Sequence, residues 1–131
     1  MPVRMELNKI IISELADQQV IVLREIDGER TFPIVIGTGE AVAISRRLKG
    51  DVPARPMTHE LLADVIDKLG GEVTRVEITD LQQHTFFARI HIRRADGEEI
   101  SIDSRPSDAI AIGIATQVPI DVNESVLSEV C

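Results

Sequence analysis

The segment 108–115 constrains the fold of this 131-residue chain more than any other part. It runs Asp-Ala-Ile-Ala-Ile-Gly-Ile-Ala, it follows Ser107, and Pro119 stands soon after it. Serine is a common helix cap and proline cannot continue a helix, so we expect a helix from Ser107 to about Gln117. Apolar residues face nearly every side of this helix. It must therefore be buried inside the domain or at a contact between subunits.

The remaining pattern predicts strands first, then helices interleaved with more strands. Period-two stretches and turn signals predict strands at 5–14, 19–25, 30–36, 72–81, 85–94 and 98–103. Cap residues and glycines predict helices at 40–49 and 58–69 and a short one from Asn123. This order is typical of an α+β fold, with a mainly antiparallel or mixed sheet and three to four helices packed on it. The length suits a single domain over residues 1–131.

The helix that Thr58 is expected to cap carries an apolar stripe at helical spacing. Its members are Leu61, Leu62, Val65, Ile66 and Leu69. We expect this stripe to be buried.

Parity decides the register of the hairpin around Asp96 and Gly97. Six apolar residues must share one face: Phe86, Ala88, Ile90, Ile92, Ile100 and Ile102. A loop with an even number of residues would break this arrangement. The loop therefore has an odd number, most simply the three residues 95–97 with Gly97 in a left-handed conformation. Three pairs then form on the outer face: Arg93 with Glu99, His91 with Ser101 and Arg89 with Asp103. The basic stripe on this strand is thus predicted to be largely neutralised by its neighbours.

Composition limits the partners and the compartment. The net charge of −8 argues against indiscriminate binding to a polyanion, and three phenylalanines with no tyrosine or tryptophan leave few rings to stack on bases. Neither fact excludes an enzyme that holds a phosphodiester briefly. No apolar run approaches the roughly 20 residues that span a bilayer, no secretory signal opens the chain, and Cys131 is its only cysteine. We expect no membrane contact and a cytoplasmic location.

The segment from Arg55 to His59 is the first candidate site. Pro56 makes the approach to the helix extended, and His59 is expected at the first helical position. The helix dipole disfavours a charged imidazolium there, so His59 should stay neutral near pH 7, as a general base or metal ligand requires. The alternative is that His59 is simply a polar first-turn residue at the surface.

The segment from Asp103 to Asp108 repeats this pattern. Arg105 and a proline precede the expected cap Ser107, and Asp108 lies in the first turn, where a carboxylate suits the helix dipole. The alternative is a capped core helix whose arginine pairs with a carboxylate.

Together the two segments offer the chemistry of phosphodiester hydrolysis. Helix starts and the guanidinium groups of Arg55 and Arg105 bind phosphate oxygens. Four residues can hold a divalent cation or orient water: Glu40, His59, Asp103 and Asp108. No signature of a P-loop, nucleophile elbow, zinc pair or EF-hand is present.

Other motifs favour structural interpretations. Gly37-Thr38-Gly39 lacks the third glycine and the later acidic residue of a dinucleotide fingerprint, so it indicates a tight strand-to-helix turn. His84 falls in a turn and His91 on a charged strand face, and we expect a structural or solvated role for both.

The ordered blocks of the sequence resemble the bifunctional nuclease domain family. They are Phe32 to Gly37, Glu40-Ala41, Arg55 to His59, Ile78 to Leu81, Thr85 to Ala88, Asp103, and Arg105 to Ala111. The resemblance covers nearly the whole chain. It implies an α+β fold, a homodimer or dimer-based oligomer, and nuclease activity with DNA and RNA as transient substrates. Phe87 stands where a tyrosine is frequent in the family, which argues against a mechanism that uses that hydroxyl.

Eight positions match the polar motif residues of the family, and we assign them hypothetical roles. Catalytic roles go to Glu40, His59 and Asp108. Substrate binding goes to Arg55, Thr58, Arg105 and Ser107. A divalent metal, Mg²⁺ or Mn²⁺, would be bound by Asp103 and Asp108.

Two other functions stay open at this stage. The negative charge and the lack of stacking rings favour a non-catalytic module that recognises a small anion or a partner protein. The wholly apolar helix is also compatible with a purely structural subunit.

Overall fold

The computed structural model describes residues 2–13, 15, 18–51 and 54–131. Over these residues the chain forms seven strands and four helices in an α+β arrangement, as expected. In chain order they are β1 (Pro2–Ile11), β2 (Gln18–Glu25), β3 (Thr31–Gly37), α1 (Thr38–Leu48), α2 (Thr58–Lys68), β4 (Glu72–Gln82), β5 (Thr85–Arg93), β6 (Glu99–Ser104), α3 (Pro106–Thr116), β7 (Ile120–Asn123) and α4 (Glu124–Val130). No helix in this part of the chain is long and apolar enough to cross a membrane.

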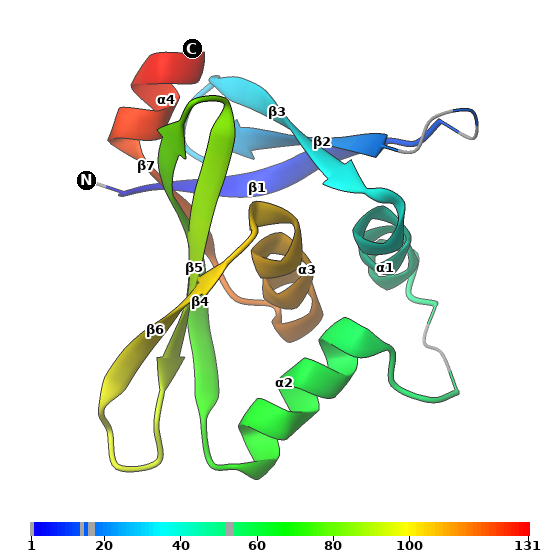
Figure 1. Ribbon diagram of the computed structural model, residues 1–131, viewed down its shortest axis with the longest axis vertical. Helices are drawn as coiled ribbons and strands as arrows, with labels where there is room; N and C mark the ends of the chain where they lie inside the picture. The colour runs from blue at the N-terminus through cyan, green and yellow to red at the C-terminus, as the bar shows by residue number, and fades with distance from the viewer. Residues whose placement is uncertain (1, 14, 16–17, 52–53) are drawn as a thin grey trace.

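The strands form one sheet in the order β3-β2-β1-β7-β4-β5-β6 (Figure 1). The described neighbours run antiparallel except for β4 and β7, which are parallel, so the sheet is mixed. The sequence did not predict β7, because four residues are too few to show an alternation. This short strand nevertheless joins the two halves of the sheet, with β1 on one side and β4 on the other.

The sheet is strongly curved. Phe32 in β3 and Phe86 in β5 lie five places apart in the strand order. In a flat sheet five strand spacings would separate them by about 24 Å. Their ring centroids are instead 5.7 Å apart. The two ends of the sheet therefore approach each other across its concave face, where the helix α3 lies (Figure 1).

The helix α3 fills this concave face, as the sequence predicted for an all-apolar helix. Five consecutive residues of it are buried: Ala109, Ile110, Ala111, Ile112 and Gly113. It packs against β4 and β5 on one side and against α1 and α2 on the other. Its environment is thus supplied within one chain, which was one of the two possibilities that the sequence left open.

The stripe expected on α2 was predicted wrongly. Leu61 is 54% exposed, Val65 45% and Leu69 81%, and Leu62 is exposed as well. Only Ile66 of the five stripe residues is packed against the core. The reason is that α2 lies at the margin of the molecule and touches α3 and β4 along one side (Figure 1). Helical spacing indicates which residues share a face, but not whether a single chain covers that face.

The hairpin between β5 and β6 has the expected register. Arg89, His91 and Arg93 lie opposite Asp103, Ser101 and Glu99, respectively. Gly97 has a left-handed φ of 88° in the three-residue loop. At the other end of the chain, β1 runs from Pro2 to Ile11 rather than over 5–14, and residue 14 lies outside the described residues.

Gly113 lies where α3 packs closely against the sheet. A Cβ at this position would meet Cγ2 of the buried Val76 at 2.9 Å. For Gly113→Ala, overpacking of about 1–3 kcal/mol should outweigh a helix-propensity gain of up to about 1 kcal/mol. We expect a lower free energy of unfolding in urea. The control is Gly39→Ala in α1, where no atom lies within 4 Å of the added Cβ, and it should leave stability equal or higher. Equal stability of wild type and Gly113→Ala would contradict this packing.

Candidate active site at the starts of three helices

The starts of α2 and α3 meet through one contact. Nε2 of His59 lies 2.9 Å from Oδ1 of Asp108. The histidine side chain is 15% exposed and the aspartate side chain 33% exposed, so the pair is partly buried. Because 49 positions separate the two residues in the chain, only the fold brings them together. The fold thus joins the starts of α2 and α3 at this contact.

Arg105 extends this pair to α1. Its Nε and Nη2 donate to Oδ2 of Asp108 at 3.0 and 2.8 Å. The same Nη2 lies 3.4 Å from Oε1 of Glu40 in the first turn of α1. Ser107 Oγ donates to that Glu40 oxygen at 3.0 Å. These residues and His59 form one connected set, which we call the helix-start cluster: Glu40, His59, Arg105, Ser107 and Asp108.

The predicted caps of both helices were wrong. Thr58 is the first helical residue of α2, and Met57 occupies the cap position instead. The carboxylate of Glu60 accepts a hydrogen bond from the backbone N–H of Met57. The helix α3 begins at Pro106, because the fixed φ of proline suits the first helical position. Ser107 is therefore the second residue of α3, and its hydroxyl bonds to α1 instead of capping its own helix.

Asp108 is the centre of the charged contacts in the cluster. Partial burial raises the pKa of Asp108, but hydrogen bonds from His59 and Arg105 outweigh it and hold this pKa below its ordinary value. The hydrogen bonds to Asp108, with the nearby charges of Asp108 and Glu40, raise the pKa of Arg105. Asp108 is thus an anion at neutral pH, and its position in the first turn of α3 also suits the helix dipole.

A groove of about 520 Å³ opens beside Arg105. Its walls are β3, the first residues of β5 and the start of α3. The charged and polar side chains along it include Glu40, Arg105, Ser107 and His84. The side chain of Arg105 is 70% exposed, and its Nη1 makes no hydrogen bond to any described residue. One terminal nitrogen of the guanidinium group is therefore available to a ligand in the groove.

His59 lines a separate, small pocket between α1, α2 and α3. Arg46 and Arg47, from the last turn of α1, line the same pocket. The sequence analysis missed both arginines, because basic residues in a last helical turn are common and serve the helix dipole. Their position beside His59 depends on how α1 packs against α3.

Three of the predicted site residues stand apart from the cluster. Arg55 and Thr58 are exposed, and neither makes a side-chain hydrogen bond or ion pair to another described residue. Asp103 lies on the outer face of β6, opposite Arg89, and makes no contact with the cluster in the described part of the chain. The fold thus places Asp103 and Asp108 in different surroundings, although only four residues lie between them in the chain.

The carboxylates of the helix-start cluster, which could bind a metal ion, already contact His59 and Arg105 of the protein itself. Among the described residues, no group of three or more His, Cys, Asp or Glu side chains is arranged to bind a metal ion. Both oxygens of Asp108 accept hydrogen bonds, and Glu40 faces Arg105. Mg²⁺ commonly uses one or two carboxylates and completes its shell with water and substrate phosphates. The expected Mg²⁺ or Mn²⁺ therefore stays a prediction.

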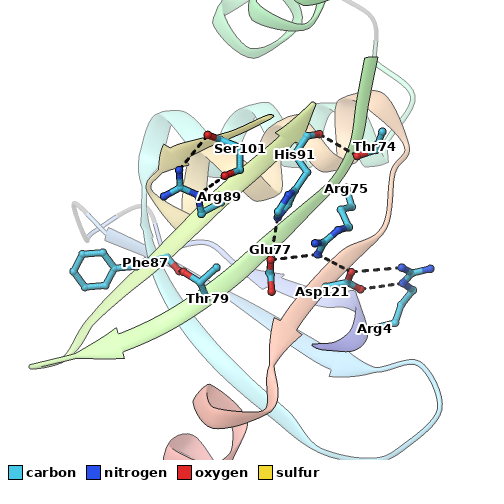
Figure 2. A network of polar contacts seen from close by, with 10 residues as sticks. All are labelled: Arg4, Thr74, Arg75, Glu77, Thr79, Phe87, Arg89, His91, Ser101 and Asp121. Carbon is cyan, nitrogen blue, oxygen red and sulfur yellow. Dashed lines mark hydrogen bonds and ion pairs between the residues drawn. The ribbon is translucent and has the colours of Figure 1, made fainter. Parts of the chain in front are cut away.

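The outer face of the sheet carries a second polar network (Figure 2). Asp121 is bound by Arg4 at 3.0 Å and by Arg75 at 3.3 Å, and Arg75 continues to Glu77. Nε2 of His91 lies 2.9 Å from Oε1 of Glu77. The network is balanced in charge, so this face is no open basic stripe.

The acids that neutralise the basic strand β5 differ from those predicted. Arg89 bonds to Ser101 rather than to Asp103, and Arg93 pairs with Glu72 of β4. Because β5 lies between β4 and β6, its cations can turn to either neighbour. Glu72 and Glu77 of β4 reach Arg93 and His91, whereas Arg89 has no carboxylate partner among the described residues.

The chain is similar to known proteins over most of its length. A family model described as the bifunctional nuclease domain matches residues 21–131. The chain belongs to this family. It is 42% identical over 120 residues to an uncharacterized protein of Mycobacterium tuberculosis, an alignment that covers 92% of this chain and 71% of that protein.

Plant members of the family are also similar. The chain is 36% identical to Bifunctional nuclease 2 of Oryza sativa subsp. japonica, over 87% of this chain and 36% of that protein. It is 32% identical to Bifunctional nuclease 2 of Arabidopsis thaliana, over 83% of this chain and 34% of that protein. The bifunctional nuclease domain described here thus spans about a third of these plant proteins.

The lowered pKa of Asp108 predicts a pH dependence of stability. Its contacts contribute to the free energy of unfolding above about pH 4, the ordinary value of the carboxyl, and are lost as pH falls through the lower folded pKa. The difference in unfolding free energy between wild type and Asp108→Asn should be largest at pH 7 and shrink below about pH 4. Urea titrations across this range measure it, with the exposed Asp64→Asn on α2 as the control. A constant difference at every pH would contradict the prediction.

Proposed function

We propose that this chain hydrolyses phosphodiester bonds of DNA and RNA at the helix-start cluster. The observation that carries the proposal is the contact of His59 and Arg105 with the two oxygens of one carboxylate, that of Asp108. A base and a cation are thereby held by the same carboxylate. Family membership supports the same activity, because several relatives are named as bifunctional nucleases.

Asp108 orients the base in this proposal. When Nε2 of His59 carries the proton, it donates to Oδ1 of Asp108, and the bond fixes both the tautomer and the ring plane. Nδ1 is then the nitrogen that accepts a proton from the attacking water. The same division of roles, in which a carboxylate orients a histidine base, operates in hydrolytic triads. Asp108 is a positioning residue here, and His59 is the catalytic residue.

Arg105 and the helix starts would bind the phosphate. Arg105 lines the groove and its Nη1 makes no hydrogen bond to a described residue, while Nε and Nη2 hold the group in place through Asp108. Unpaired N–H groups at the start of α3 add donors to an anion. Arg46 and Arg47 supply further positive charge on the His59 side. These three arginines lie near four acids, namely Glu40, Asp51, Glu60 and Asp108, so phosphate binding would depend on directed contacts with the guanidinium groups rather than on an excess of positive charge.

The proposal is tested by cleavage of single-stranded DNA and RNA. His59→Ala should lower the rate about 100-fold or more, because a general base contributes about 10²–10⁴-fold. His91→Ala is the matched control: its ring also binds a carboxylate at 2.9 Å, but on the outer face of the sheet, and cleavage should persist. Equal cleavage by wild type and His59→Ala would indicate a contaminating nuclease or another site. Assays with Mg²⁺, with Mn²⁺ and with EDTA decide whether a divalent cation takes part.

A second function is supported by the ion pairs of Arg105. Both Glu40 and Asp108 lie against its guanidinium group, so they compete with phosphate for it. A bound anion must displace them, and this competition, together with the net charge of −8 and the lack of stacking rings, argues against a polyanionic substrate and leaves a non-catalytic module for a small anion or a partner protein as the alternative. Thermal-shift measurements with nucleotides and sugar phosphates distinguish the two. Stabilisation without turnover supports the binding module.

The exposed face of α2 supports self-association, and we propose a homodimer as the form of the protein in solution. Leu61, Leu62, Val65 and Leu69 form an apolar patch that the chain leaves uncovered. The groove between Leu69 and Ile100 continues this patch to β6. As the edge strand, β6 presents unpaired backbone groups beside it. A second copy of the chain would present the same apolar patch and the same edge strand to the first.

Light scattering at micromolar concentration tests this association. The wild type should have the mass of a dimer, and Leu61→Glu combined with Val65→Glu should be monomeric, because two charges cannot be buried without partners. Asp64→Asn on the same helix serves as the control and should remain dimeric. A wild-type monomer at this concentration would contradict the homodimer.

A further inference from the structure

The turn between β4 and β5 has an unusual backbone for its sequence. Gln82 pairs with Thr85, so the loop consists of the two residues Gln83 and His84. Their φ angles are 49° and 66°, both in the left-handed region. Two-residue hairpin loops of this form are normally built from Asn-Gly, because a residue with a full side chain is strained there. This chain accepts that strain at two consecutive positions.

The turn carries His84 to the groove beside Arg105. His84 lines this groove together with Glu40, Arg105 and Ser107. It comes from the tip of a hairpin, whereas the other three come from α1 and α3. The curvature of the sheet brings the tip of this hairpin close to β3, so that the groove lies between them (Figure 1). A residue that the sequence placed in a surface turn thus belongs to the wall of the candidate site.

His84 differs from the other two histidines in having no partner. His59 and His91 each lie 2.9 Å from a carboxylate. The exposed ring of His84 makes no hydrogen bond or ion pair to any described residue. No contact in the described part of the chain therefore uses this imidazole, although the backbone around it is strained. Strained residues of this kind cluster at ligand clamps and active sites.

We propose that His84 is a substrate-binding residue that donates a hydrogen bond to a phosphate oxygen of a nucleic-acid strand in the groove. An imidazole N–H is available as a donor in either protonation state. Arg105 Nη1 would contact the same strand from the α3 side, so that the anion is held from two walls. The inference rests on the proposed phosphodiester substrate. It assigns His84 to binding and leaves proton transfer to His59.

The strain in the turn makes the proposal testable in two independent quantities. The double variant Gln83→Asn with His84→Gly supplies the preferred turn sequence and removes the imidazole. Relief of strain should raise its melting temperature, while loss of the hydrogen bond should weaken binding about tenfold. The single variant Gln83→Asn keeps His84 and is the matched control, with affinity unchanged. His84→Asn also tolerates a left-handed φ and should weaken binding without the change at position 83.

Binding is measured by fluorescence anisotropy with a short phosphorothioate oligodeoxythymidine, which resists cleavage. In parallel, cleavage of the ordinary oligonucleotide should show a raised KM and a kcat within about twofold for both His84 variants, whereas His59→Ala lowers kcat. Weaker binding together with a higher melting temperature in the double variant supports the assignment. Unchanged affinity in both His84 variants overturns it, as does a lower melting temperature in the double variant, which would make His84 a structural residue.

The outcomes separate this inference from the proposed function. If the wild type cleaves, His59→Ala does not, and the His84 variants bind like wild type, the nuclease proposal stands and the role of His84 is refuted. If no cleavage occurs but the probe binds and His84→Asn weakens it, the nuclease proposal fails and the role of His84 stands. If the probe does not bind to the wild type at all, the role of His84 is refuted.

Discussion

The burial of α3 is the constraint on which the rest of the structure depends. A helix whose five consecutive residues 109–113 are buried needs apolar neighbours on every side, and one flat sheet covers only one side. The sheet therefore curves around α3, and α1 and α2 close the opposite side. Gly113 and Val76 show how tightly helix and sheet approach. Residues at the start of α3 are positioned by this packing, because a buried helix has little freedom to slide or turn.

The candidate site follows from where that helix begins. Arg105 precedes the first turn of α3 and Asp108 lies in that turn. Side-chain contacts join this region to the start of α2 at His59 and to the first turn of α1 at Glu40. Helix starts concentrate unpaired N–H groups and positive potential, which attract carboxylates of the protein as well as anionic ligands. Glu40 and Asp108 lie in first turns for this reason, and Arg105 is held between them. The same arrangement that pre-positions the cation also keeps two carboxylates in competition with any phosphate.

Two pairs of histidine and carboxylate show why geometry alone does not assign a function. His59 with Asp108 and His91 with Glu77 have the same separation of 2.9 Å. The first pair joins two helix starts beside a pocket whose charged lining residues are Arg46, Arg47, Asp51 and Glu60. The second lies within a balanced network on the outer face of the sheet (Figure 2). The environment of each pair distinguishes a candidate base from a structural contact.

The sequence by itself determined most of the local structure. Side-chain parity predicted the three-residue loop at Gly97, and the apolar pattern predicted the buried helix at 108–115, because both depend on periods of two and 3.6 residues within a short segment. It also indicated that His59 and Asp108 stand at helix starts. The predicted cap residues of α2 and α3 were wrong by one and two positions. A glutamate in the first turn of α2 and a proline at the start of α3 define these helix starts instead of the Thr58 and Ser107 hydroxyls.

Only the tertiary structure decided which of these elements meet. β7 carries too short a pattern to be predicted, yet it joins the two halves of the sheet. The exposure of Leu61 on α2 depends on what surrounds the helix, and so does the place of His84 in a groove formed by β3 and α3. Asp103 and Asp108 are near neighbours in the chain but lie in different surroundings. Contacts between distant segments arise from packing around one core, and no local pattern of residues records them.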